Sequence, residues 1–249
     1  MGSETAGAML CPQRRWAGCL HHIHIRLLGI GLVTTALLLL FGAFSPSYAD
    51  QTRIPDYEQA RWLFWNELYT KGGKTLYCGK SFSSRYRKGL NIEHVFPMGW
   101  VTNKLDCGTR KQCRNNSKRF NRIEADLHNL YPSRQDVNDA RSAYRFGMLP
   151  GEPRAFGACD FEADEKKRVA EPRPASRGEI ARAMFYMKEE YGLIIFRKSG
   201  ELLKAWHFQD PPSKHEKWRN NRIEMIQRTR NVFIDDPGLV DLIDFSGNN

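Results

Sequence analysis

Two short runs decide the fold of this chain. Residues 91–97 read Asn-Ile-Glu-His-Val-Phe-Pro, and residues 124–132 read Glu-Ala-Asp-Leu-His-Asn-Leu-Tyr-Pro. Each run contains an apolar stretch of strand length and closes on a proline, which removes a hydrogen-bond donor from a strand ladder. We therefore expect one strand over residues 89–95 and a second over residues 124–130.

Reactive side chains gather around these two runs. The first run places a carboxylate beside a histidine, Glu93 and His94, and the polar segment after the second run carries Asn138 and Arg141. Acid, base, amide and guanidinium within residues 89–147 indicate a hydrolytic site rather than a plain core. Adjacent strand residues point to opposite faces, so Glu93 and His94 share a site only where the strand bends or ends.

The same side chains suit phosphodiester hydrolysis. That reaction needs a base to activate water, a Lewis acid on the phosphate and a cation to offset developing charge. His94 is a suitable base, because the ordinary pKa of histidine, about 6.5, leaves the ring able to accept a proton near neutral pH. Glu93 and Asn138 offer hard oxygen ligands, which suit Mg²⁺ or Mn²⁺ better than zinc.

The N-terminal segment has the pattern of an export signal. Three arginines precede an apolar run at residues 27–44, and the small residues Ser47 and Ala49 follow it. We predict a signal peptide over residues 1–49, cleaved near Ala49, and a periplasmic or secreted single domain over residues 50–249. The alternative is an uncleaved anchor, because the apolar run is about as long as the shortest membrane-spanning helices.

The mature chain is basic. After the first 49 residues are removed, 35 Lys and Arg face 27 Asp and Glu, a net charge of +8. A basic exported protein is a candidate for a polyanionic partner such as nucleic acid, an anionic envelope polymer or a membrane surface. The alternative reading of the charge is solubility alone.

Four cysteines remain after the export signal. An even number in an exported chain indicates two disulfides, for which three pairings are possible. Cys107 and Cys113 are close enough in sequence to close a small loop, so we favour Cys107–Cys113 and Cys78–Cys159. A zinc site made by cysteine and histidine is the competing interpretation, and the cysteine spacing fits it poorly.

Strands and helices do not alternate along the chain, which favours an α+β fold over a doubly wound sheet. The expected architecture is a mostly helical single domain with a small antiparallel sheet. The patterns predict helices at 57–70, 136–146, 179–191 and 214–230, a further strand beginning at 75–78, a basic loop at 107–122, a long loop at 148–174 and an irregular tail at 231–244.

Several ordered motifs together resemble the endonuclease I family of exported bacterial nucleases, which are built on a ββα-metal (His-Me) finger. The motifs are Ile-Glu-His-Val-Phe-Pro, Cys-Gly-Thr-Arg-Lys-Gln-Cys, Glu-Ala-Asp-Leu-His-Asn-Leu-Tyr-Pro and Val-Asn-x-x-Arg-Ser-x-x-x-Phe, in that order. The resemblance places the finger at about residues 89–147 and continues through the C-terminal segment.

The resemblance implies a role for each residue of the site. His94 corresponds to the general base, and Glu93 and Asn138 to the protein ligands of a single Mg²⁺, for which Mn²⁺ can substitute. Arg110 corresponds to the arginine that holds the phosphate, and Glu124 to an acidic residue that supports His94. The implied activity is endonucleolytic cleavage of DNA, and of RNA, with little sequence preference and with 5′-phosphate ends.

The basic run gives a set of candidate nucleic-acid contacts: Arg110, Lys111, Arg114, Lys118, Arg119 and Arg141. Arg141 has an alternative role, pairing with an acid inside the fold. His128 is interpreted as a core histidine. We expect a monomer without a stable protein partner, and the alternative function is a basic exported nucleic-acid-binding protein whose catalytic site has decayed.

Overall fold

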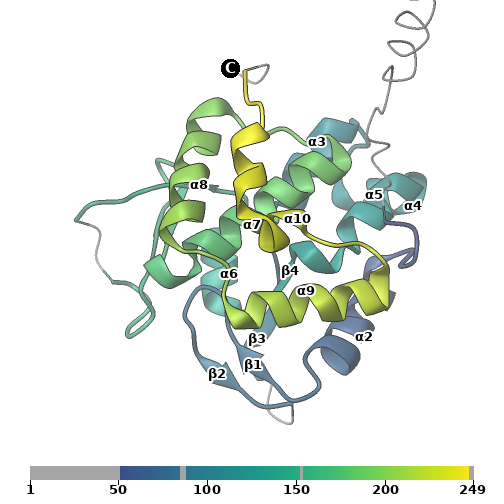
Figure 1. Ribbon diagram of the computed structural model, residues 1–249, viewed down its shortest axis with the longest axis horizontal. Helices are drawn as coiled ribbons and strands as arrows, with labels where there is room; N and C mark the ends of the chain where they lie inside the picture. Colours follow the sequence, from purple (N-terminus) through teal and green to yellow (C-terminus); the bar gives the residue numbers. More distant parts are fainter. Residues whose placement is uncertain (1–50, 85–87, 152–153, 247–249) are drawn as a thin grey trace, which may run out of the picture. The chain divides into compact units, whose positions relative to one another are not determined.

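The centre of the fold is a pair of antiparallel strands followed by a helix (Figure 1). In the computed structural model, β3 (Leu90–His94) pairs with β4 (Leu130–Arg134). Helix α6 (Gln135–Arg141) begins directly after β4 and packs against both strands. The predicted first strand and the α+β class are confirmed.

The structure describes residues 51–84, 88–151 and 154–246. The predicted signal peptide or anchor, residues 1–49, lies outside these residues. Within them, no helix combines the length and the apolar character that crossing a membrane requires.

The β3–β4 pair separates two buried clusters. Ile92 and Leu130 belong to a cluster with the N-terminal helix, whereas Tyr131 belongs to the larger cluster around α7 (Pro174–Tyr191). This division follows from strand geometry, because successive side chains alternate between the two faces. Both faces of the pair are therefore covered, which explains its apolar sequence.

The N-terminal helix agrees with the aromatic pattern at 57–70. Helix α2 (Tyr57–Leu63) starts at Asp56, whose side chain accepts a hydrogen bond from the Gln59 main chain, and it continues as a π-helical turn over Phe64–Leu68. The strand expected from residue 75 is wrong. Thr75 closes a turn through hydrogen bonds with Gly79 and Lys80, and the short strands β1 (Gly73–Lys74) and β2 (Ser81–Phe82) flank it.

The basic segment 107–122 is helical, so the predicted basic loop is wrong. After α3 (Met98–Leu105), the chain forms α4 (Arg110–Asn116) and α5 (Lys118–Glu124). Thr109 and Gln112 make reciprocal hydrogen bonds that start α4, and Ser117 caps α5. Thr-x-x-Gln is a capping-box signature, and it is visible in the sequence.

The second strand lies further along the chain than predicted. Residues 124–130 contain the end of α5 and a 3₁₀ turn, Leu127–Asn129, because the Asp126 side chain accepts from the His128 main chain and caps that turn. The strand therefore starts at Leu130. It passes through Pro132, whose carbonyl accepts a hydrogen bond from the Leu76 main chain.

The helix expected at 136–146 is shorter, and the expected long loop contains strands. Helix α6 stops at Ser142, whose φ of 49° is incompatible with a continued helix. A three-stranded sheet follows, with β5 (Arg145–Phe146) parallel to β7 (Val169–Pro172) and β6 (Phe161–Asp164) antiparallel to β7. This sheet is therefore mixed, whereas the sequence predicted an antiparallel sheet.

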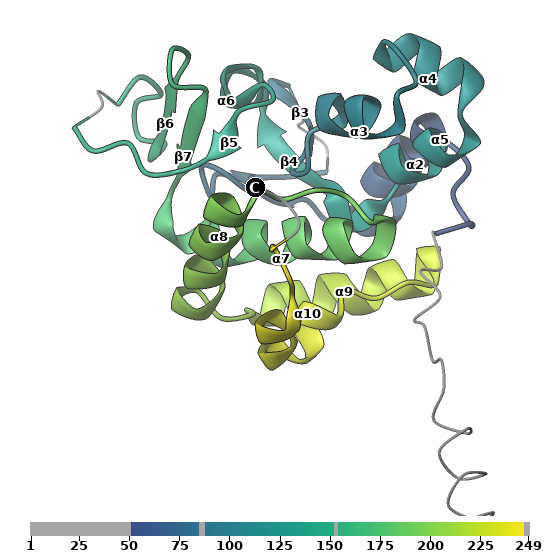
Figure 2. The same ribbon diagram turned by 90° about the horizontal axis from the view of Figure 1, so that it is seen from above.

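Four helices complete the domain (Figure 2). They are α7, α8 (Arg197–Gln209), α9 (Lys214–Gln227) and the short α10 (Val232–Asp235), followed by a 3₁₀ segment over Pro237–Leu242. The helices expected at 179–191 and 214–230 are confirmed, whereas the tail expected to be irregular is partly helical. A buried ion pair between Arg182 and Glu216 joins α7 to α9.

Two disulfide bonds close loops of very different length. Cys78–Cys159 spans 81 residues and ties the turn before β2 to the strand region after α6, whereas Cys107–Cys113 spans 6 residues at the start of α4. These are the two pairs that the sequence favours.

We expect the long-range disulfide to stabilise the fold more than the short one. In the loop-entropy model, the pair of substitutions Cys78→Ala and Cys159→Ala lowers the free energy of unfolding by about 4.5 kcal/mol, against about 2 kcal/mol for Cys107→Ala with Cys113→Ala. Urea denaturation of the two double variants measures the difference. Equal losses would show that loop length does not control their contributions.

Candidate active site

One cavity of about 460 Å³ is lined by the side chains that the sequence singles out. Glu93 and His94 enter it from the end of β3, Asn138 from α6 and Arg110 from the first turn of α4. The strand ends at His94, and this end allows two adjacent residues to face one cavity. The structure thus brings together four groups that are up to 45 residues apart in the chain.

His94 is held as a neutral ring with a defined tautomer. Its Nε2 lies 3.0 Å from the main-chain oxygen of Glu124. A carbonyl only accepts, so Nε2 carries the hydrogen and Nδ1 keeps its lone pair. Burial, helped by the positive charge of Arg110, lowers the pKa of His94 to about 3, so the imidazole is neutral at physiological pH.

Glu93 is a buried carboxylate with an oriented side chain. Its Oε1 accepts a hydrogen bond of 2.6 Å from the Tyr77 hydroxyl and lies 3.4 Å from Nη1 of Arg141. Burial raises the pKa of this carboxyl, and Arg141 and the Tyr77 hydrogen bond oppose that rise. Such outer partners fix the direction of a ligand side chain.

Asn138 presents its amide oxygen rather than its nitrogen. Nδ2 donates to Oδ1 of Asn91 at 2.9 Å and to the main-chain oxygen of Ile92 at 3.3 Å. These bonds occupy the amino end of the side chain, which lines the cavity beside Glu93. The amide oxygen is therefore the atom available to a ligand in the cavity.

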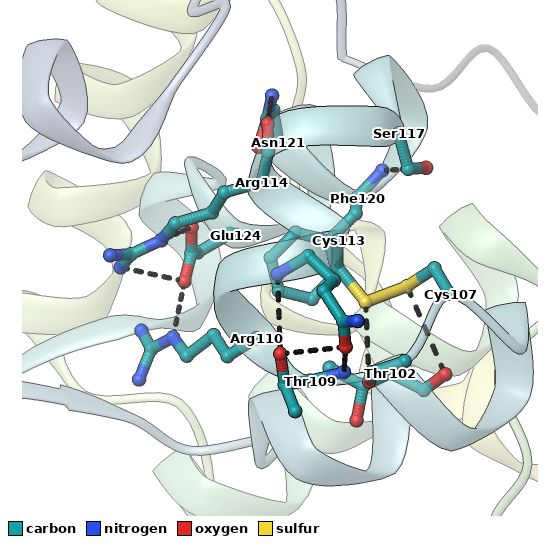
Figure 3. The surroundings of a disulfide bond; sticks show 12 residues. Thr102, Cys107, Thr109, Arg110, Cys113, Arg114, Ser117, Phe120, Asn121 and Glu124 are labelled. Atoms are coloured by element: carbon teal, nitrogen blue, oxygen red, sulfur yellow. Dashed lines mark hydrogen bonds and ion pairs between the residues drawn. A yellow bond between two sulfur atoms is a disulfide. The ribbon is translucent and has the colours of Figure 1, made fainter.

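The side chain of Glu124 binds two arginines of α4 (Figure 3). Its carboxylate, only 1% exposed, binds Nε of Arg110 and forms a two-point pair with Arg114 at 2.7 and 2.9 Å. Glu124 thus supports His94 through its main chain and holds two arginines through its side chain. Arg110 and Arg114 remain 45% and 41% exposed, so both reach solvent from this anchor.

The other predicted nucleic-acid contacts include both exposed and buried side chains. Lys111 and Lys118 are exposed on α4 and α5, and Arg119 donates to the main-chain oxygen of Tyr191. Arg141 is buried, with hydrogen bonds to the main-chain oxygens of His94 and Val95. Together with its contact to Glu93, this burial gives Arg141 the alternative role, pairing with an acid inside the fold.

His128 is a core residue, as its sequence context predicts. It is fully buried against the ring of Tyr186, with ring centroids 4.4 Å apart, and its Nε2 lies 3.1 Å from the main-chain oxygen of Thr229. Burial lowers its pKa to about 4. His128 does not line the cavity that contains His94.

The site can hold a hard divalent cation through oxygen. Among the described residues, no three His, Cys, Asp or Glu side chains cluster as a metal site. The cavity instead offers one carboxylate, Glu93, and one amide oxygen, Asn138. Two oxygen donors with the rest of the coordination sphere left to water and phosphate fit Mg²⁺ or Mn²⁺ and do not fit zinc.

Comparison with known proteins decides the family. The Endonuclease I family model matches residues 47–238, most of the chain. The chain belongs to the endonuclease I family of nucleases. The predicted family is therefore confirmed, and with it the assignment of the chain as an endonuclease, a phosphodiester hydrolase.

Individual relatives agree with this assignment. An extracellular deoxyribonuclease of Aeromonas hydrophila is 35% identical over 228 residues, covering 82% of this chain and 96% of the relative. A periplasmic deoxyribonuclease of the same organism is 34% identical over 235 residues, covering 84% and 96%. An extracellular ribonuclease of Bacillus subtilis is 29% identical over 190 residues, covering 68% and 60%.

Two tyrosines that contact the side chains of the candidate site were not predicted from the sequence. Tyr57 of α2 places its ring 5.2 Å from that of His94 and within 6 Å of the guanidinium groups of Arg110 and Arg114. Tyr77 orients Glu93. The aromatic face of residues 57–70 offered a signal for Tyr57, whereas Tyr77 lies in a turn whose sequence carries none.

We expect Glu124→Gln to separate the two functions of Glu124. The main-chain acceptor for His94 remains, so catalytic turnover is retained, while Arg110 and Arg114 lose their charged anchor and KM for nucleic acid rises several-fold. Because the Glu124 carboxylate is buried while both arginines are partly exposed, the free energy of unfolding falls by about 2 kcal/mol. Steady-state kinetics and urea denaturation measure the two effects.

Asp136→Asn is the matched control, because Asp136 pairs with Arg134 at the surface outside the cavity. This control is expected to leave KM unchanged. A loss of turnover in Glu124→Gln with normal KM would contradict the division of roles.

Proposed function

We propose that this endonuclease I family member is an exported, Mg²⁺-dependent and sequence-nonspecific endonuclease that cleaves DNA, and also RNA, and leaves 5′-phosphate ends. The observation that carries the proposal is the shared cavity of Glu93, His94, Arg110 and Asn138. The names of the relatives, which include deoxyribonucleases and a ribonuclease, support both substrates and an extracellular or periplasmic location.

In this proposal His94 is the general base. Its Nε2–H is fixed on the Glu124 carbonyl, so Nδ1 accepts a proton from the attacking water. The Tyr57 ring packs against the imidazole with the two planes tilted by 42°, and this contact restricts the orientation of His94. The low pKa means that the free ring is ready to accept a proton rather than already charged.

Arg110 holds the scissile phosphate. It donates to Glu124 through Nε, which leaves its two Nη groups to form charge-assisted hydrogen bonds with phosphate oxygens. Arg114, Lys111 and Lys118 extend the positive surface along α4 and α5. Contacts of this kind are made with the backbone rather than with base edges, and they therefore give sequence-independent, salt-sensitive binding.

Glu93 and Asn138 would hold the Mg²⁺. When bound, this ion supplies a Lewis acid for the scissile phosphate and stabilises negative charge on the leaving 3′ oxygen. Both side chains are preorganised for this role. Tyr77 and Arg141 orient Glu93, and Asn91 and the Ile92 carbonyl orient Asn138.

We expect His94→Ala to reduce plasmid cleavage in Mg²⁺ by about 10²- to 10⁴-fold, the usual contribution of a positioned general base. His215→Ala is the control, because His215 is exposed on α9 outside the cavity, and it is expected to retain full activity. Agarose-gel nicking assays with circular dichroism as a folding check measure both.

Cleavage that persists in a folded His94→Ala variant would contradict the assignment of the base. A folded wild-type protein that binds DNA yet fails to cut it in Mg²⁺ or Mn²⁺ would favour the alternative of a decayed nucleic-acid-binding protein.

We expect EDTA to abolish cleavage and added Mg²⁺ or Mn²⁺ to restore it. Asn138→Ala removes one of two protein ligands, so the Mg²⁺ concentration for half-maximal activity rises by at least about tenfold. Electron paramagnetic resonance of Mn²⁺ binding gives a readout independent of cleavage. Asn66→Ala, on the exposed side of the N-terminal helix, is the control and should leave Mn²⁺ affinity unchanged.

A further inference from the structure

A second cavity, of about 500 Å³, lies on the other side of α3 from the active site. We call it the aromatic groove and define it by its lining residues: Phe96, Trp100, Asn103, Lys104, Leu193, Ile194 and Phe196. No acidic side chain lines it. The proposed catalytic mechanism makes no use of this groove.

Helix α3 is the wall between the two cavities. Trp100, Asn103 and Lys104 are spaced i, i+3 and i+4 and face the groove, whereas Gly99 and Thr102 lie on the opposite side and line the active site. An α-helix with its side chains is about 10 Å across. A nucleic-acid strand whose scissile phosphate lies in the active site advances about 3.4 Å per stacked nucleotide. Such a strand therefore reaches the groove within a few nucleotides.

The two cavities are also joined by a hydrogen bond. The indole nitrogen of Trp100 donates to the main-chain oxygen of Ala143 at 3.1 Å, and Ala143 lines the active site. The Trp100 ring is held further by an edge contact with Phe96, at 5.5 Å between centroids. The aromatic wall of the groove is thus fixed in position relative to the site.

The opposite wall is an apolar segment in which Leu193 and Ile195 are buried and Ile194 and Phe196 are exposed. Residues 192–196 join α7 to α8 and run back beside α3 (Figure 2). Phe196 is 62% exposed and Ile194 is 37% exposed. The ring of Phe196 is therefore available for contact with a ligand at the groove.

Positive charge around the groove favours an anionic ligand. Lys104, Arg197 and Lys198 are exposed, and none of them forms an ion pair with a residue that the structure describes. Aromatic faces with unpaired cations and no acid are the features by which proteins bind single-stranded nucleic acid, through base stacking and phosphate contact.

We propose that the aromatic groove binds unpaired nucleobases of the substrate strand beside the scissile phosphate, with stacking on Phe196 and Trp100 and a phosphate contact from Lys104. The inference rests on the proposed nuclease function and extends it, since it gives the enzyme a subsite for single-stranded nucleic acid. Continuity with the active site through α3 and the unpaired cations favour this occupant over an apolar peptide or a second copy of the chain.

The test is a binding measurement that does not depend on cleavage. Metal-free protein in EDTA is titrated into two fluorescent oligonucleotides of about 12 nucleotides, one of thymidines and one abasic with the same number of phosphates. Phe196→Ala is expected to raise Kd for the thymidine strand about tenfold and to leave the abasic strand unchanged. Lys104→Ala is expected to raise Kd for both strands by the same factor.

Phe208→Ala is the matched control, because this phenylalanine is 53% exposed on α8 and does not line the groove. It should bind both strands as the wild type does. The inference is overturned if Phe196→Ala binds both strands normally, if it weakens both equally, or if sedimentation shows a wild-type dimer that this substitution dissociates. Loss of Mg²⁺-dependent cleavage with the expected binding pattern intact would count against the proposed function alone.

Discussion

The antiparallel pairing of β3 with β4 ends at His94 and Leu130, and the active-site cavity lies at this end. Inside a regular strand, Glu93 and His94 would point to opposite faces, so the proposed metal ligand and the proposed base could not face one cavity. At the end of the strand this constraint is relaxed. The same pairing carries β4 directly into α6 and thereby returns Asn138 to the strand from which Glu93 projects.

Glu124 connects this strand end to the basic helices. Its main-chain oxygen fixes the tautomer of His94, and its buried carboxylate anchors Arg110 and Arg114. Glu124 thus sets both the position of His94, the proposed base, and the positions of the two arginines. The two neighbouring arginines would repel each other without the carboxylate between them, and the short Cys107–Cys113 loop further restricts where α4 begins.

Helix α3 then organises the surface that the substrate meets. One of its faces lines the candidate active-site cavity and the other lines the aromatic groove. A substrate strand that contacts Arg110, passes α3 and stacks on Phe196 would use the phosphate backbone for affinity and the bases for non-specific stacking. This arrangement is consistent with an enzyme that needs no particular sequence.

The sequence by itself predicted the family, several elements and a candidate site. Glu93, His94 and Asn138 were proposed from residue type and order, and Arg110 from the resemblance to the family. The strand at 89–95 and the helices at 57–70, 179–191 and 214–230 were predicted from hydrophobic patterns, which are local because each depends on residues a few positions apart. The Thr109–Gln112 capping box is also local, and it was the available signal that the basic segment is helical rather than a loop.

Tertiary structure decided the rest, for reasons that no local pattern contains. The strand predicted at residues 124–130 starts only at Leu130. The reason is that Asp126 caps a turn and accepts hydrogen bonds from the hydroxyls of Tyr186 and Tyr191, more than fifty residues away. The hairpin of β6 and β7 is stabilised by pairing with β5 and by the Cys78–Cys159 bond. Arg141 is buried beside Glu93, so it pairs with an acid inside the fold and does not reach the surface. Tyr57 and Tyr77 contact His94 and Glu93 only in the folded chain, because contacts across such sequence distances depend on packing.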